Sequence, residues 1–127
     1  MAFQILKISF THVSSSFTEN LNRDLIDNPK KFNQWKKVIL KNDDSPDNLY
    51  FKFCGPGVKN VGYINLKLDH DSAKAYFMHP KYGPPADDKI KAFIFSQFIE
   101  FLIKNYNQYI KDFSFFMSNN YSFIYDC

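Results

Sequence analysis

The residue types that could carry chemistry are few in this chain and lie far apart along it. The histidines are His12, His70 and His79, and no two of them have the i, i+4 spacing of two metal ligands on one helix. Cys54 precedes Gly55-Pro56-Gly57, and a thiolate nucleophile there would need a neighbouring base or a helix N-terminus. We therefore expect no metal site and no catalytic residue, and we expect Cys54 to be buried.

Two acidic segments are expected to be exposed loops. Asp43, Asp44 and Asp47 lie in a polar run that lacks the Gly and the distal Glu of a calcium-binding loop. Asp69-His70-Asp71 lies where the chain must turn, and Asp is common in turns. Charges at exposed edges contribute to the specificity and the rate of association. We therefore expect a partner to contact Asp43, Asp44, Asp47, Asp69, His70, Asp71 and Tyr82.

Length and composition indicate one folded domain, residues 1–127. Of the 127 residues, 45% are hydrophobic and 23% are charged, which suits a core that needs no disulfide or metal. The aromatic share is 19%, and the formal net charge is +3. This mild charge and the single Arg argue against sequence-specific nucleic-acid binding, because Arg supplies the commonest base-specific contact. A nucleic-acid-binding domain is the third possibility.

The sequence does not carry the marks of an exported or membrane protein. Its first residues lack the basic leader, the apolar region and the cleavage site of a signal peptide. The longest apolar-rich stretch, 92–103, is interrupted by Ser96, Gln97 and Glu100, which makes it too short and too polar to span a bilayer. We therefore expect a cytoplasmic protein without a membrane partner.

Hydrophobic periodicity predicts the secondary structure. Alternating apolar residues predict strands over 3–13, 49–54, 61–68, 73–79, 113–117 and 121–125. Capping signals and apolar stripes predict one helix from a capping box at 16–19 to about residue 27, a second from Asn28-Pro29 through Trp35 and Ile39, and a long third helix over about 87–111. The order β-αα-βββ-α-ββ predicts an α+β fold: a single mixed, mostly antiparallel sheet with helices packed on it.

The second half of the chain has the layout strand, turn, strand, loop, long helix. With the strands Val61–Leu66 and Ala73–Pro80, this layout resembles the core of GNAT-type acetyltransferases. The resemblance implies that acyl-CoA binds with its pyrophosphate at the N-terminus of the long helix. It further implies that Lys81, Tyr82 and Gly83 contact the cofactor, and that His79 or a Tyr is the general acid or base.

The loop departs from that family's pattern at the place where the phosphates would bind. Pro84 and Pro85 lack the backbone N–H donors that phosphates need. Asp87 and Asp88 place negative charge at the same helix start. An acyltransferase is therefore the second possibility, and we expect no cofactor.

The overall profile of the sequence suggests a different class of protein. The chain is short, aromatic-rich, biased toward the AT-rich codons of Lys, Asn, Ile and Phe, and free of catalytic motifs. This profile resembles that of bacterial toxin-immunity proteins, of the contact-dependent growth inhibition or colicin type. The resemblance implies a non-enzymatic cytoplasmic protein that neutralises one cognate toxin domain by direct binding, and a basic member would suit a toxin with an acidic face. This is the function that we expect first.

Overall fold

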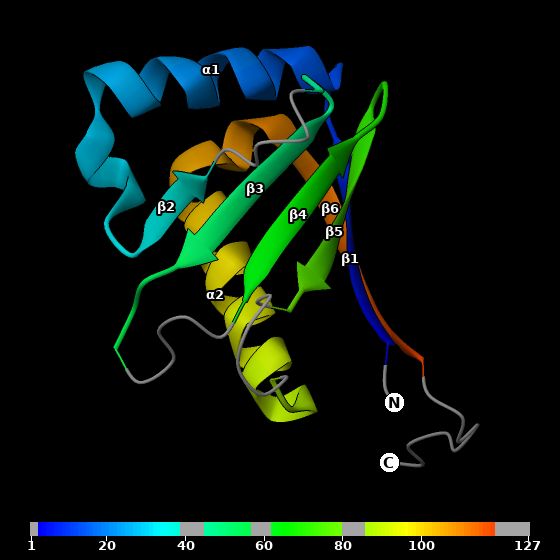
Figure 1. Ribbon diagram of the computed structural model, residues 1–127. Helices are drawn as coiled ribbons and strands as arrows, with labels where there is room; N and C mark the ends of the chain where they lie inside the picture. Colours follow the sequence, from blue (N-terminus) through cyan, green and yellow to red (C-terminus); the bar gives the residue numbers. More distant parts are fainter. Residues whose placement is uncertain (1–2, 39–44, 57–61, 80–85, 119–127) are drawn as a thin grey trace.

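The protein is an α+β fold, with a six-stranded sheet covered by helices on one face (Figure 1). The computed structural model describes residues 3–38, 45–56, 62–79 and 86–118. The elements, with 3-10 helices marked η, are β1 (Phe3–Phe10), α1 (Ser14–Asp27), η1 (Pro29–Phe32), β2 (Trp35–Val38), β3 (Asn48–Phe53), β4 (Tyr63–Leu68), β5 (Ser72–Met78), α2 (Asp88–Tyr106), η2 (Asn107–Tyr109) and β6 (Ile110–Ser118). The predicted fold class is confirmed.

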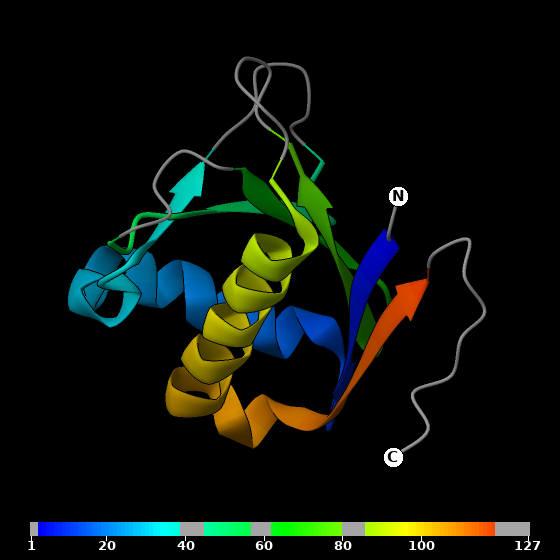
Figure 2. The same cartoon turned by 90° about the horizontal axis from the view of Figure 1, so that it is seen from below.

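The strand order across the sheet is β2-β3-β4-β5-β1-β6, and all neighbours are antiparallel. Strands β2 to β5 follow one another along the chain and pair in sequence. β1 then lies between β5 and β6, so the first and last described strands are neighbours. Figure 2 shows that the sheet curves around α2 and that both helices lie on its inner side.

The hydrophobic core lies between the sheet and the two helices, and it is largely aromatic. Phe98 in the middle of α2 is fully buried, and its ring centroid lies 5.1 Å from that of Trp35 and 5.5 Å from that of Phe51. Phe17 of α1 stacks on Phe10 of β1 at 5.1 Å. Among the described residues, neither helix is both long enough and apolar enough to cross a membrane.

One buried carboxylate joins α1 to α2. Asp24 accepts hydrogen bonds from the Tyr106 hydroxyl at 3.0 Å, from Asn28 Nδ2 at 3.1 Å and from Lys31 Nζ at 3.0 Å. Burial opposes ionisation of Asp24, but these three donors outweigh it and hold the pKa of the carboxyl below its usual value. Burial, and then the hydrogen bond to Asp24, raise the pKa of Tyr106. This carboxylate is therefore ionised and fully paired inside the fold.

Two predicted local features differ from the structure. The segment after Asn28 forms only the short η1, and Trp35, which we expected on a second helix, begins strand β2. Trp35 and Phe32 are buried as a core stripe requires, but Trp35 reaches the core from a strand that pairs with β3. α1 begins at Ser14 without a side-chain cap, so the predicted capping box does not form.

The C-terminal part also differs from the prediction in its boundaries. α2 ends at Tyr106, and the following strand begins at Ile110, a few residues earlier than predicted. The side chain of Asp87 caps α2 by accepting a hydrogen bond from the Ile90 N–H at 2.8 Å, in agreement with the acidic helix start that we predicted. The predicted strand over 121–125 lies outside the described residues.

Candidate binding surface

Four lysines stand between two apolar residues within a strand. Alternate side chains of a strand point to opposite faces of a sheet, so the apolar neighbours of each lysine point to the helices and the lysine points away from them. The four triplets are Leu6-Lys7-Ile8, Phe51-Lys52-Phe53, Leu66-Lys67-Leu68 and Ala73-Lys74-Ala75. On β2, Lys36 lies on the same outer face, because it pairs with Lys52. We call this side of the sheet, on which no described helix packs, the lysine face.

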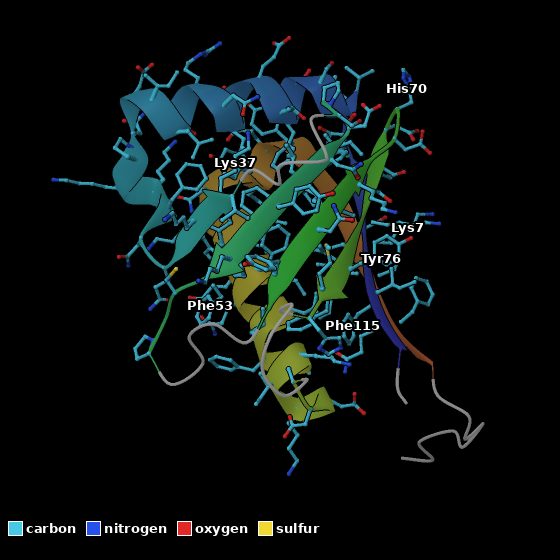
Figure 3. All side chains as sticks on the ribbon, viewed as in Figure 1. Lys7, Lys37, Phe53, His70, Tyr76 and Phe115 are labelled. Carbon is cyan, nitrogen blue, oxygen red and sulfur yellow. The ribbon has the colours of Figure 1, made fainter. Side chains whose placement is uncertain are left out.

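Cross-strand register brings these lysines directly opposite one another. Lys74 on β5 pairs with Lys7 of β1 on one side and with Lys67 of β4 on the other. Lys36 pairs with Lys52 in the same way. Residues in such pairs have Cβ atoms about 5 Å apart, and like charges placed there repel each other. Figure 3 shows Lys7 pointing away from α2, on the outer side of the sheet.

Compensating charge is scarce on the lysine face. Within the described strands the only carboxylate on this face is that of Asp112, which pairs with Ser9 on β1. In the described part of the chain, none of these five lysines forms an ion pair, since the salt bridges found there belong to Lys31 and Lys91. Within the described residues, the face therefore carries a net positive charge that no ion pair neutralises.

A row of larger side chains separates the two groups of lysines. Tyr50, Asn65, Tyr76 and Ile5 follow one another across β3, β4, β5 and β1. Tyr50 and Asn65 are only 7% and 4% exposed, and Asn65 Nδ2 donates to the Leu49 carbonyl at 3.3 Å. The ammonium of Lys67 lies 5.4 Å from the ring centroid of Tyr76, a cation–π contact. The centre of the face is thus a closed surface rather than a set of exposed rings.

Three of the residues that we expected to contact a partner come together at one end of the sheet. Asp47, Asp69 and His70 line a cavity of about 350 Å³ beside the start of α1. Asp69 Oδ1 accepts a hydrogen bond from the His70 N–H at 2.8 Å, and the Ser14 N–H donates to the His70 carbonyl at 2.7 Å. The hydrogen bond from Ser14 therefore holds this turn against the start of α1.

The other predicted site residues are distributed differently. Asp71 lies with His70 and His12 around an adjacent cavity of about 510 Å³. In the described residues no group of three His, Cys, Asp or Glu side chains could hold a metal ion. The remaining predicted residues, Asp43, Asp44, Lys81, Tyr82 and Gly83, lie outside the described residues.

The acidic turn borders the lysine face. Lys67, Asp69, Lys74 and Tyr76 line one cavity of about 190 Å³, together with Ser72 at the start of β5. Positive charge on β4 and β5 therefore gives way to negative charge within two or three residues, at the turn that joins these strands. The turn and the adjoining lysines therefore form neighbouring patches of opposite charge.

Two other candidates do not join this surface. Cys54 is exposed, so our expectation that it is buried is wrong: Phe53 is buried in the core, and the next residue of an extended chain points to the opposite face. Burial of the imidazole, and then the charge of Lys91, lower the pKa of His79 and favour its neutral form. The ring of His79 contacts that of Phe77, with 5.3 Å between their centroids.

The lysine face was not among the expected sites, although the sequence carries a signal for it. The repeated pattern of a lysine between two apolar residues, in four different strands, marks the same side of the sheet each time. Only the strand order, however, places Lys7 beside Lys74, far apart along the chain.

Comparison with known proteins adds no constraint. No family model matches the chain, no curated protein matches it, and no solved structure matches its fold. The lysine face and its acidic border are therefore interpreted from their own chemistry.

Proposed function

We propose that this protein is a non-enzymatic binding module whose lysine face binds an acidic surface of a partner protein. The observation that carries the proposal is the row Lys7, Lys74 and Lys67, three like charges in direct cross-strand register without a described counter-charge. Each like-charged pair costs the fold up to about 1 kcal/mol. A partner that supplies carboxylates at this row would remove that repulsion and gain charge-assisted hydrogen bonds.

An acidic protein fits this surface better than a single-stranded nucleic acid. Such nucleic acids bind where exposed aromatic rings offer stacking platforms between basic residues. Here the rings at the centre of the face are largely closed to stacking, because Tyr50 is 7% exposed and Lys67 lies over the ring of Tyr76. The more exposed ring of Phe116 lies at the β6 edge of the sheet, away from this centre. Lysine ammonium groups can still bind carboxylates, and electrostatic attraction between opposite patches accelerates association.

The acidic turn restricts how a partner can be oriented on the lysine face. Asp69, His70 and Asp71 border the positive row, so a partner must present carboxylates over Lys67 and Lys74 and avoid like charge over the turn. Opposed patches of this kind contribute to specificity by excluding the wrong alignment. We therefore keep Asp47, Asp69, His70 and Asp71 as rim residues of the proposed interface.

The biological role that we propose is neutralisation of a toxin domain with an acidic face. A small single domain that blocks its target by direct binding requires a surface of this kind and no catalytic group. The proposal would place the protein in the cytoplasm of a bacterium, beside the toxin that it inhibits.

Binding measurements with a charge-reversed variant test this function. The probe is the purified product of the neighbouring gene, measured by calorimetry against the wild-type chain, Lys74→Glu and Lys89→Glu. Lys89 is exposed on α2, so it provides the same charge change away from the lysine face. We expect Lys74→Glu to weaken binding by about 10-fold or more and Lys89→Glu to leave it unchanged.

The same measurement separates the competing functions. An oligothymidylate that binds more tightly than the protein probe, and loses affinity in Lys74→Glu, would replace the proposal with nucleic-acid binding. Acetyl-CoA that raises the melting temperature of the wild-type chain would instead support the acyltransferase alternative. Failure of all three probes to bind would contradict the proposed role.

A further inference from the structure

The two edge strands of the sheet differ in length and in how strongly their side chains hinder pairing with a further strand. β2 forms one edge with four residues, two of which are Lys36 and Lys37. β6 forms the other edge with nine residues, and its charged residues, Lys111 and Asp112, both lie near its start. Short, lysine-bearing edges resist pairing with another strand, whereas long apolar edges favour it.

Two large apolar side chains are exposed near the middle of β6. Phe115 is 44% exposed on the helix side of the sheet, and Phe116 is 55% exposed on the lysine face. Within the described residues β6 pairs with β1 alone, so its outer row of backbone N–H and C=O groups has no strand partner there. An added strand would satisfy those backbone groups and cover both rings at once.

We propose that β6 pairs antiparallel with β6 of a second copy of this chain. Two identical edges related by a two-fold axis satisfy each other's backbone groups, and phenylalanine rings from both copies meet on each side of the joined sheet. With the axis at Phe115, the two Phe115 rings face each other on the helix side and the two Phe116 rings are diagonal neighbours on the lysine face. Lys111 and Asp112 then lie toward the far end of the opposite strand. Like charges of the two copies are therefore not opposed, and the register is compatible with the sequence of β6.

The symmetry determines how the dimer presents its faces. In antiparallel pairing between two identical edges, the two-fold axis is perpendicular to the sheet, so the same face of both copies lies on the same side. The helices of both copies then cover one side, and both lysine faces lie on the other. The dimer follows from the β6 edge alone, and it does not depend on the function of the lysine face.

Light scattering and amide hydrogen exchange test this pairing in the full 127-residue chain. Across a dilution series, the mass should approach twice the chain mass of 15.0 kDa at high concentration and fall toward 15.0 kDa on dilution. In the concentrated sample the amides of β6 should exchange more slowly than in the dilute one. The amides of β2, the opposite edge, should exchange at the same rate in both samples.

A matched pair of variants locates the interface. Ser114 is exposed in the middle of β6, and Ser96 is exposed on α2. Ser114→Lys brings two positive charges together near the two-fold axis and should weaken the dimer by about 10-fold or more. Ser96→Lys makes the same change away from the edge and should leave the dimer unaffected. Circular dichroism of both variants verifies that they are folded.

Three results would overturn the proposal. The first is a monomer at every concentration, and the second is a dimer whose β6 amides exchange at the rate of the monomer. The third comes from a chain that ends at Ser118: if this shortened chain forms dimers and the full chain does not, residues 119–127 occupy the edge instead of a second copy. Lys74→Glu should dimerise like the wild-type chain, so failure of the dimer and failure of the proposed function remain distinguishable.

Discussion

Alternate residues of the same strands build the two faces of the sheet, and these faces have opposite chemistry. On the helix side, Leu6, Phe51 and Ile64 are fully buried in an aromatic and aliphatic core. On the other side, Lys7 and Lys52 occupy the neighbouring positions of the same strands. A shift of one residue therefore separates the face that packs against the helices from the face that carries the lysines.

The two sides also treat charge differently. Asp24, on the helix side, is buried and accepts hydrogen bonds from three donors. Lys7, Lys74 and Lys67 on the lysine face lie in cross-strand register and repel each other, and none of them forms an ion pair with a described residue. The buried charge is satisfied by hydrogen bonds, whereas the like charges in cross-strand register repel each other and cost stability.

The largest expected change in the free energy of unfolding comes from a substitution in the core, on the helix side of the sheet. Phe98→Ala should lower the free energy of unfolding by about 3–5 kcal/mol, because it removes contacts with Trp35 and Phe51 and leaves a cavity. Urea denaturation followed by the fluorescence of Trp35 measures this change, since Trp35 is the single tryptophan of the chain.

The matched control on the lysine face is Tyr63→Ala. Tyr63 is a half-buried aromatic residue between Lys52 and Met78 on the lysine face. Its removal should cost about 1 kcal/mol or less, because no described helix packs over it. If Tyr63→Ala destabilised the protein as much as Phe98→Ala, the division of roles between the two faces would be wrong.

An intermediate effect is expected at the buried carboxylate. Tyr106→Phe removes one of the donors to Asp24 and should lower the free energy of unfolding by about 1–3 kcal/mol. Because the folded pKa of Asp24 is depressed, its stabilising contribution is present above the ordinary carboxyl pKa and is lost as the pH falls through the folded value. Urea denaturation between about pH 6 and pH 2 should therefore give a shallower decline for Tyr106→Phe than for the wild type. An identical decline would show that Tyr106 does not stabilise the ionised carboxylate.

Much of the fold could be predicted from local patterns. Alternation along β4 and β5 and the long apolar stripe of α2 were sufficient to predict an α+β sheet with helices on it. The segment around Trp35 was misassigned because Phe32, Trp35 and Ile39 have helical spacing, while the pairing of Trp35 with Phe53 depends on a strand that is distant in sequence. Long-range pairing overrode local periodicity at this position.

The candidate surface was harder to predict than the fold. Each lysine between two apolar residues can be assigned to the outer face of its own strand from sequence alone. Their assembly cannot, because β1 lies between β5 and β6 and so places Lys7 beside Lys74. The acidic turn at Asp69 was predicted correctly as a turn, since its side chain caps the next backbone N–H.

The smallest expected change in the free energy of unfolding comes from the row of Lys7, Lys74 and Lys67, and here the substitution should stabilise the protein. Lys74 lies between Lys67 and Lys7, so Lys74→Glu converts two repulsive pairs into two attractive ones. It should raise the free energy of unfolding by up to about 1 kcal/mol at low salt, and Lys74→Gln, which only removes repulsion, should raise it less. The gain should shrink when the salt concentration rises from about 0.05 M to about 0.5 M, because ions screen exposed charges. Urea denaturation of both variants at the two salt concentrations measures the difference. A Lys74→Glu variant less stable than the wild type at low salt would mean that the lysines are not in conflict, and the contrast between the two faces would then lose its electrostatic part.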